Sequence, residues 1–320
     1  MPTKPYTTVQ QQLTILNSRG IELGDDAERW LGVVTYYRLS GYAYPYRVIN
    51  DVGPPVKRGD DYEAGTRFEY VTRLYEFDRK LRTLLFDGLE RVEVALRRGI
   101  ADIIGKNDPL GYLDASLFRD SFAHADWLDT VHTKRLAKAR RRDAAIKHHF
   151  EKYGGECPIW VAVDALDFSD ASRLFEGLRA RDQFQVAEAI GIRIDLSVLS
   201  RRQRTKVTSH HPMGRWLEQA TVARNIAAHH GRLWNRGLAP ANGTAMRTVR
   251  GLEGVPAGQS ESVFGLLCFV SVVLETTSPG STWINKVRTL IETELLSIPG
   301  RTAAEMGAPE GWRSLPMWRE

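Results

Sequence analysis

The chain has 320 residues, of which 42% are hydrophobic and 26% are charged, proportions that are ordinary for a water-soluble protein with a substantial core. Its length exceeds that of a usual single domain, so one large domain with a small appendage and two modest domains are both open. The formal net charge of +5 and the isoelectric point near 9.2 favour a polyanionic partner without establishing one, because net charge bears on partners and not on fold.

The cysteines and the apolar runs argue against several classes of protein. Only Cys157 and Cys268 occur, and their positions indicate neither a disulfide framework nor a zinc site, so a reducing compartment fits. Residues 1–6 lack a basic region followed by an apolar stretch, and the longest apolar run, Val263–Leu274, is too short to span a bilayer. We therefore expect a cytoplasmic protein with no membrane partner.

The first part of the chain predicts short helices. Thr7 and Gln10 have the spacing of a capping box, and Gly20 stands where the first helix would end. A second helix is predicted over residues 26–34. The following segment, residues 35–47, packs tyrosines and arginines into a turn-rich stretch that we interpret as a tyrosine-lined junction to the main domain; stacking on nucleic-acid bases is the alternative.

The rest of the chain also has helical periodicity. Residues 53–60 predict a loop, and apolar residues then recur at helical spacing from Phe68 almost to Gly105, which indicates one long amphipathic helix. The Gly-, Pro- and Ala-rich segment 237–260 is the one long loop after the predicted helix at residues 213–230, and such a loop is a candidate to cover or border a site. Further helices are predicted at residues 118–153, 169–180, 182–190, 196–208, 213–230, 261–276 and 281–296.

No convincing strand pattern and no repeat is found, so the predicted fold class is all-α. The expected organisation is an N-terminal helical extension over residues 1–60, a main helical domain over residues 61–300, and a tail over residues 301–320 that packs on that domain.

Two short stretches concentrate the basic residues. The first contains Lys134, Arg135, Lys138, Arg140, Arg141 and Arg142, and the second contains Arg201, Arg202, Arg204 and Lys206. A solvated helix face and a phosphate-binding surface explain such runs about equally well when each is taken alone. We assign RNA binding to the first stretch.

The segment from Met213 to Gly231 sorts into two faces when each residue is turned by ~100°. Asn225 and His229 lie one helical turn apart on the polar side, and the long stem of Arg224 can bring its guanidinium to the same space. The opposite stripe, which we expect to be buried, contains Trp216, Ala220, Ala223, Ala227 and His230.

This pattern, R-N-x-x-x-H, suits the cleavage of RNA. RNA supplies its own nucleophile in the 2′-hydroxyl, so cleavage needs only proton transfer and stabilisation of the phosphorane-like charge. Arginine offers a permanent charge and a planar fork to phosphate oxygens, and histidine can move a proton near neutral pH. The histidine pairs of this chain are adjacent in sequence and point ~100° apart on a helix, so we expect no metal ion and no cofactor.

Several short motifs, taken in order along nearly the whole chain, resemble the Abi-like proteins of bacterial phage defence, the abortive-infection AbiD/AbiF group. The matching segments are residues 4–6, 10–13, 36–42, 75–82, 90–97, 157–160, 224–229, 232–236, 306–312 and 316–318. The resemblance implies a helical domain of the HEPN type, whose R-x-x-x-x-H motifs meet across a two-fold homodimer to form a composite ribonuclease site.

The same resemblance assigns roles to individual residues. His229 is expected to act as general base or acid, Arg224 to stabilise phosphate charge, and Asn225 to orient the phosphate or the histidine, giving 2′,3′-cyclic phosphate and 5′-hydroxyl ends. Glu93 and Arg97 are candidate supports for this motif, although an ordinary i,i+4 ion pair is slightly preferred.

The residues that follow the motif are expected to support it or to bind RNA. Arg232 and Arg236 are candidates for flanking phosphates, with helix C-capping as the alternative. His230, which lies on the apolar stripe, is assigned to packing.

Three functions are open at this level. The first is an endoribonuclease that acts as an anti-phage effector or toxin and is kept silent by a regulator, with an associated small RNA as a further partner. The second is a non-catalytic helical protein that holds a structured small RNA in a defence complex. The third is a purely structural dimerisation module in phage sensing.

Overall fold

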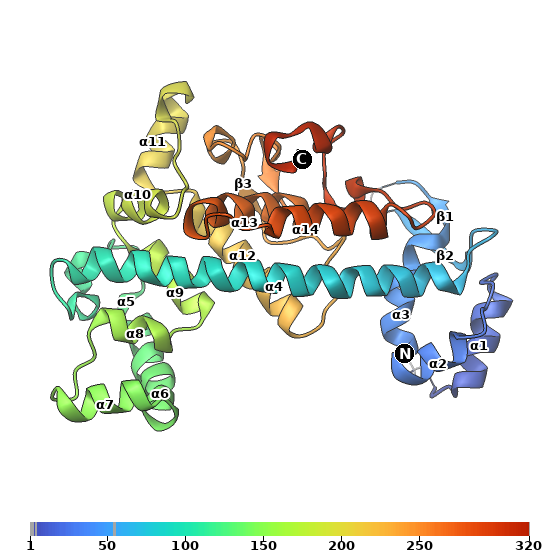
Figure 1. Ribbon diagram of the computed structural model, residues 1–320, viewed down its shortest axis with the longest axis horizontal. Coiled ribbons are helices and arrows are strands. Elements are labelled where there is room, and N and C mark those ends of the chain that lie inside the picture. Colours follow the sequence, from blue (N-terminus) through green and yellow to red (C-terminus); the bar gives the residue numbers. More distant parts are fainter. Residues whose placement is uncertain (1–2, 4, 54–55, 320) are drawn as a thin grey trace. The chain divides into compact units, whose positions relative to one another are not determined.

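The computed structural model describes residues 3, 5–53 and 56–319, and its architecture is helical with two small antiparallel sheets (Figure 1). The predicted all-α class is therefore confirmed. Lys4 of the first family-like motif and Pro54 and Pro55 of the predicted loop lie outside the described residues. Among the residues that the structure describes, no helix combines the length and the apolar character that a membrane crossing needs.

The chain divides into two compact units. Unit 1 consists of Met1–Arg82 and Arg288–Ala303, and unit 2 consists of Thr83–Val287 and Ala304–Glu320. The longest helix, α4 (Phe68–Gly105), gives its first part to unit 1 and the rest to unit 2. The domain boundaries expected from the sequence, at residues 60 and 300, stay a prediction.

Unit 1 begins with three short helices, α1 (Val9–Ser18), α2 (Ala27–Val33) and α3 (Tyr36–Ala43). The capping box of α1 lies one residue later than predicted: Thr8 is the N-cap, its hydroxyl accepts from the Gln11 backbone, and the Gln11 side chain accepts in return. The hydroxyl and carbonyl of Thr7 instead accept from the side chain of Gln12. Neighbouring threonines offer the same cap chemistry, so the sequence did not determine which one caps.

The tyrosine-rich segment is helical, which corrects the turn-rich expectation. Thr35 caps α3, and one side of the helix buries Leu39, Tyr42 and Ala43. The Tyr42 hydroxyl donates to Asp78 on α4 at 2.6 Å, and Arg82 pairs with the same carboxylate, which is fully buried. Burial is the main cause that raises the pKa of Tyr42, so this hydroxyl stays a donor that ties α3 to α4.

A two-stranded hairpin in unit 1 was not predicted. Strand β1 (Arg47–Asp51) pairs antiparallel with β2 (Lys57–Tyr62), with an irregular register between Arg47 and Asp51. Only Tyr62 of β2 is buried, so the hairpin lacks the apolar alternation that marks a half-buried strand. Backbone pairing holds it, and a hydrophobicity pattern does not register such pairing.

Unit 2 carries the helices that surround the predicted motif. They are α5 (His124–Thr130), α6 (Ala137–Arg142), α7 (Ala144–Lys152), α8 (Ile159–Ala165), α9 (Phe168–Gly177), α10 (Ala180–Ala189), α11 (Arg201–Ser209), α12 (Met213–Ala228), α13 (Val263–Thr277) and the start of α14 (Trp283–Leu290). The predicted helix over residues 118–153 is in fact broken. It begins at His124, passes through a π turn at Val131–Leu136, and stops at Asp143, whose carboxylate caps α7.

The core of unit 2 lies between α4, α9, α12 and α13. Helix α12 packs on α9 and on α13, and α13 buries nearly every residue from Val263 to Leu274. Helix α4 runs alongside α13 (Figure 1), and they approach so closely at Gly88 that an added Cβ would lie 2.7 Å from Val270. A glycine is therefore required at this contact.

The long segment 237–260 is ordered and mostly packed against the core. It contains β3 (Ala241–Asn242) and β4 (Gln259–Ser260), which pair with each other. The Trp216 indole donates to the carbonyl of Asn242, and the Gln219 amide donates to the carbonyls of Ala239 and Ser260. These contacts place the segment on the buried side of α12, about 120° or more around the helix from Asn225.

Candidate active site at the end of helix α12

Helix α12 presents two faces, as the periodicity predicts. Trp216, Ala220, Ala223 and Ala227 are buried, which confirms four of the five members of the expected core stripe. The fifth, His230, is wrongly assigned: it is exposed and adopts a left-handed backbone with φ of 57°. The helix ends at Ala228, so His230 lies beyond it and the helical turn angle no longer applies.

The three motif residues lie together at this helix end. Asn225 and His229 are exposed, and Arg224 is half-buried. Arg224 Nη1 donates to Asn225 Oδ1 at 3.3 Å, and the backbone N–H of His229, the C-cap residue, donates to the carbonyl of Asn225 at 3.0 Å. The end of α12 therefore presents a guanidinium, an amide and an imidazole to solvent.

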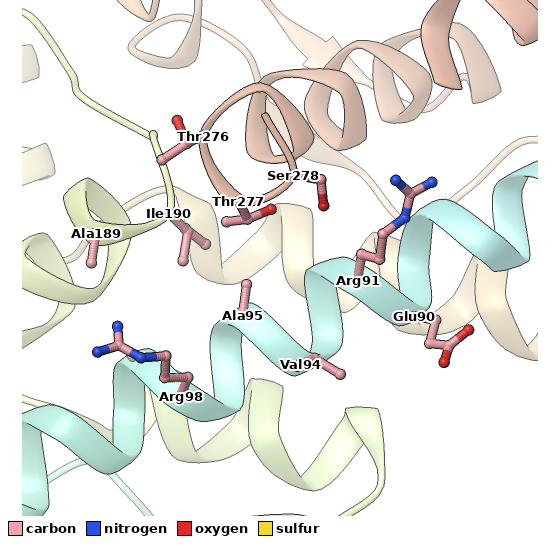
Figure 2. A pocket seen from close by; sticks show the side chains of 11 residues that line it. Glu90, Arg91, Val94, Ala95, Arg98, Ala189, Ile190, Thr276, Thr277 and Ser278 are labelled. Atoms are coloured by element: carbon pink, nitrogen blue, oxygen red, sulfur yellow. The ribbon is translucent and has the colours of Figure 1, made fainter. Parts of the chain in front are cut away.

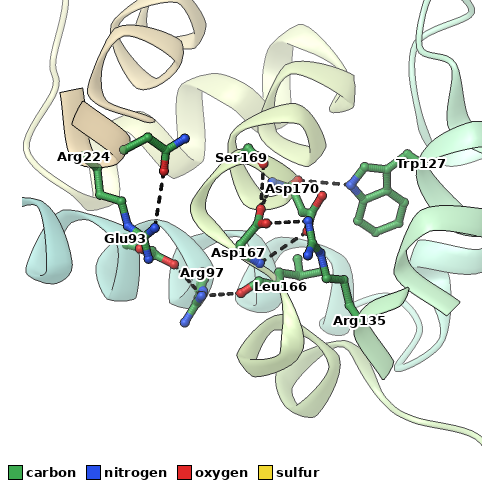
Figure 3. A network of polar contacts seen from close by, with 10 residues as sticks. Glu93, Arg97, Trp127, Arg135, Leu166, Asp167, Ser169, Asp170 and Arg224 are labelled. Carbon is green, nitrogen blue, oxygen red and sulfur yellow. Dashed lines mark hydrogen bonds and ion pairs between the residues drawn. The ribbon is translucent and has the colours of Figure 1, made fainter. Parts of the chain in front are cut away.

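Arg224 is also held from below by α4. Its guanidinium carbon lies 5.6 Å from the centre of the Phe86 ring, and its charge acts on the carboxyl group of Glu93 (Figure 3). Burial is the main cause that raises the pKa of Glu93, and the positive charges of Arg97 and Arg224 oppose that rise. An aromatic face and a buried carboxylate thus both lie near the guanidinium of Arg224.

Glu93 and Arg97 form the expected i,i+4 ion pair on α4. Glu93 is 8% exposed, and Arg97 also donates to the carbonyl of Leu166 at the end of α8. This pair is largely buried, unlike a surface pair, so it fixes the Glu93 carboxylate in place. Its action on Arg224 stays a prediction.

A second cluster of ion pairs forms around Asp167, the residue that comes directly after Leu166 (Figure 3). The guanidinium of Arg135 pairs with both Asp167 and Asp170, and Ser169 donates to Asp167 at 2.6 Å. Asp167 caps α9, and the carbonyl of Asp170 accepts from the indole of Trp127 at 3.0 Å. Because Leu166 and Asp167 are neighbours in sequence, the two clusters share one turn of backbone.

The predicted RNA-binding residues of the first basic stretch fall into two groups. Arg135 points inward and is engaged by its two carboxylates. The exposed members, which lie on the π turn and on α6, are Lys134, Lys138, Arg140, Arg141 and Arg142. Beyond the helix end, Arg232 is half-buried and Arg236 is exposed, and the fully buried Trp234 anchors the segment between them. RNA binding by either group stays a prediction.

A pocket of about 490 Å³ lies elsewhere on unit 2. Figure 2 shows Arg91 and Arg98 of α4 at its two ends, with Val94 and Ala95 between them and Thr277 of α13 opposite. Arg91 and Ala95 lie ~160° around α4 from Glu93, so the pocket is on a different side of this helix. None of the three motif residues lines this pocket.

His211 and the two cysteines are buried in the fold. His211 is fully buried against Phe184, and burial lowers its pKa to about 3. Burial raises the pKa of Cys157 to about 11 and that of Cys268 to about 12. In the described part of the chain, no three His, Cys, Asp or Glu side chains are grouped as a metal site requires.

Fold and site together define an all-α protein with an exposed Arg-Asn-His cluster at a helix end. The model of the Abi-like protein family matches residues 29–235, which is more than half of the chain and includes α12 and the Glu93–Arg97 pair. The chain therefore belongs to the Abi-like protein family. The family name points to abortive-infection defence, and membership is compatible with a nuclease role. No curated protein and no solved structure matched the chain.

Sequence reasoning missed Phe86, and it did not predict that Arg135, assigned to RNA binding, turns inward. Phe86 lies on the predicted long helix but outside its apolar stripe, and an aromatic residue at such a position is a signal that the sequence does contain. The structure leaves its side chain 38% exposed. The sequence contains no signal that the Arg135 side chain points inward, because its partners Asp167 and Asp170 come from a distant part of the chain.

Proposed function

We propose that this protein is a metal-independent endoribonuclease that acts as an anti-phage abortive-infection effector or toxin. The observation that carries the proposal is the cluster at the end of α12, where the half-buried Arg224 lies beside the exposed Asn225 and His229, and the buried carboxylate of Glu93 is within its electrostatic reach. Membership of the Abi-like family supports the role in defence.

The chemistry assigned to the cluster is internal transesterification of RNA. The 2′-hydroxyl oxygen forms a bond to phosphorus, the bond from phosphorus to the 5′-oxygen breaks, and the products are a 2′,3′-cyclic phosphate and a 5′-hydroxyl. His229 takes the 2′ proton or gives a proton to the leaving 5′-oxygen, and Arg224 stabilises the charge on the phosphate oxygens. Asn225, which accepts from Arg224, orients the guanidinium or the phosphate.

The complete site is proposed to form between two copies of the chain in an HEPN-type homodimer. Within one chain, the contacts of the Arg224 side chain in the described residues are with Phe86, Glu93 and Asn225, and none of these is His229. One reaction also needs both a proton acceptor and a proton donor, whereas each motif supplies one histidine. A two-fold axis at the end of α12 brings a second histidine and a second arginine to the same phosphate.

The exposed cations of the π turn and α6 are proposed to hold the RNA, and Arg232 and Arg236 to contact phosphates that flank the cleaved bond. An exposed lysine or arginine that pairs with a phosphate releases counterions, so binding is expected to weaken steeply with salt.

The test is the end chemistry of RNA incubated with the wild type, Arg224→Ala and His229→Ala in a metal chelator. We expect cyclic phosphate and 5′-hydroxyl ends from the wild type and a loss of at least about a hundredfold in each variant. His148→Ala, at an exposed histidine on α7, is the matched control and should cleave at the wild-type rate.

Cleavage at the wild-type rate by either site variant would contradict the assignment. Tight, salt-dependent binding of RNA that stays intact with the wild type would support the rival function, a non-catalytic protein that holds a structured small RNA.

A further inference from the structure

Helix α11 lies in a stretch of the chain that carries positive charges alone. Between Asp195 and Glu218 there is no acidic residue, and the five cations there equal the formal net charge of the whole chain, +5. They are Arg201, Arg202, Arg204, Lys206 and Arg215. Four of these five lie within the two turns of α11.

The four cations of α11 are exposed and lack carboxylate partners. Within the described residues, none of Arg201, Arg202, Arg204 and Lys206 has a carboxylate oxygen within 4.0 Å. Exposure to solvent does not by itself explain why these four cations lack carboxylate partners. Arg98 and Arg181, whose side chains are 75% and 82% exposed, still pair with Asp102 and Asp182.

A small apolar cluster holds this helix in place. Val207 of α11 packs with Leu199 and Ala245, and three partly buried residues pack against them, Phe184, Ile194 and Leu196. Ser200 and Gln203 form a capping box at the start of the helix. The cations are therefore presented on an ordered helix and not on a loose tail.

The charge does not serve the stability of the helix. Arg201 and Arg202 occupy the first turn, where the helix dipole favours carboxylates, and the capping box uses neutral Gln203 in place of glutamate. Four like charges in two turns also repel each other. The arrangement costs stability, and a polyanion that binds it would recover that cost.

The structure favours nucleic acid over a lipid surface as this polyanion. A helix that lies in a membrane needs an exposed apolar face, whereas Val207, the apolar residue of α11, is only 7% exposed because it packs in the cluster. Three of the four cations are arginines, whose planar fork suits phosphate oxygens.

We propose that α11 is a second contact surface for the phosphodiester backbone of single-stranded RNA, with the identity of the polyanion resting on the proposed function. The surface consists of Arg201, Arg202, Arg204 and Lys206. It is separate from the basic residues of α6, because α11 and α6 lie on opposite sides of α4 in unit 2 (Figure 1). The contact reads charge and not base sequence, since it offers no aromatic platform.

The test compares two variants of equal charge in a His229→Ala background, in which RNA stays intact. The α11 variant carries Arg201→Gln, Arg202→Gln, Arg204→Gln and Lys206→Gln. The control variant carries Arg29→Gln, Lys57→Gln, Arg67→Gln and Arg181→Gln, four exposed cations that already have carboxylate partners. Each set lowers the formal net charge from +5 to +1, by removal of four positive charges.

The measurement is the Kd for a short fluorescein-labelled single-stranded RNA at a series of salt concentrations, with circular dichroism to confirm folding. We expect the α11 variant to bind about tenfold or more weakly, and the slope of log Kd against log salt to fall by about 1 to 3, since each lost phosphate contact removes ~0.7. The control variant should keep most of the affinity and the slope.

Each other outcome overturns the proposal. Equal losses in the two variants would show that only net charge matters, and unchanged binding by the α11 variant would show that α11 does not touch RNA. Failure of the parent protein to bind RNA at low salt would also overturn the proposal. If that protein instead bound phosphatidylglycerol vesicles, the polyanion would be a lipid surface. The nuclease assignment fails separately, when the wild type binds RNA through α11 but leaves it uncut.

Discussion

The carboxylate of Glu93 pairs with the guanidinium of Arg97 and also lies within the electrostatic reach of Arg224. One buried acid thus serves two arginines, one from its own helix and one from α12. Arg97 is fixed further by the carbonyl of Leu166, so the acid can move little. We therefore predict that α4 helps to position Arg224, which is carried by α12.

Replacement of Glu93 by glutamine is expected to lower kcat about tenfold while KM changes less, because Arg224 loses the charge that holds its guanidinium. Burial raises the pKa of Glu93, so as pH falls its carboxylate should protonate earlier than an exposed one and release Arg224. The wild type should lose activity on the acid side, and Glu93→Gln should lack that part of its pH profile. Steady-state cleavage rates across pH measure both effects.

Glu69→Gln is the matched control, because Glu69 is an exposed acid in the first turn of the same helix, far from Glu93. It should leave kcat and the pH profile as in the wild type. Partial recovery by Glu93→Asp would support a positioning role. A wild-type pH profile in Glu93→Gln would refute it.

Mixed dimers test whether the site is shared between two chains. His229→Ala is expected to be inactive alone. When it is mixed with the wild type under conditions of subunit exchange, each mixed dimer keeps only one of the two histidines that the composite site needs. The cleavage rate of a fixed amount of wild type should fall to about half after exchange with an equal amount of His229→Ala, because about half of the wild-type chains are then in inactive mixed dimers. An unchanged rate despite demonstrated exchange would place the site within one chain.

Arg135→Gln is expected to affect stability first. It leaves Asp170, whose side chain is 3% exposed, without its cation, and the loss should be about 2 kcal/mol because Arg135 itself is partly exposed. Lys138→Gln, at an exposed position on α6, should change stability by less than ~0.5 kcal/mol and weaken RNA binding. Urea unfolding and RNA titration of both variants separate the two roles, and equal stabilities would contradict the structural role of Arg135.

His211 predicts a fall in stability at acid pH. Burial lowers its pKa from 6.5 to about 3, so below pH 6.5 the unfolded chain takes up a proton that the folded chain refuses. The contribution is fully present above pH 6.5 and is lost as pH falls towards 3, at a cost of about 2 kcal/mol by pH 5.

His211→Asn keeps an acceptor for the backbone N–H of Met213, which now donates to His211 Nδ1 at 3.2 Å. Its stability, measured by urea unfolding at pH 7.5 and pH 5, should vary less than that of the wild type by about this amount. The same change at exposed His148 should retain the wild-type difference. An identical pH dependence in His211→Asn would contradict the prediction.

The helical class and the motif helix could be predicted because they depend on local periodicity. Trp216, Ala220, Ala223 and Ala227 recur at helical spacing, and the structure buries all four. The prediction is wrong at His230, because periodicity does not show where a helix ends. It also missed α8, a seven-residue helix that starts after Pro158 and is too short to establish a period.

The environment of the motif could be predicted only in part. The Glu93–Arg97 pair follows from i,i+4 spacing along one helix. The contacts of Arg224 with Phe86 and of Arg135 with Asp170 join segments distant in sequence, and many other carboxylates and aromatic rings were equally available to these arginines. Which of these partners an arginine contacts is determined by the tertiary packing of the helices.

The polar network beneath Arg224 also sets an order of assembly during protein synthesis. Its members enter the ribosomal exit tunnel at widely separated times, first Glu93 and Arg97, then Arg135, then Leu166 to Asp170, and last Arg224. Before α12 has been synthesised, Arg97 is available to pair with Glu93, but Arg224 is not. The end of α12 therefore receives its support only when most of unit 2 has left the ribosome.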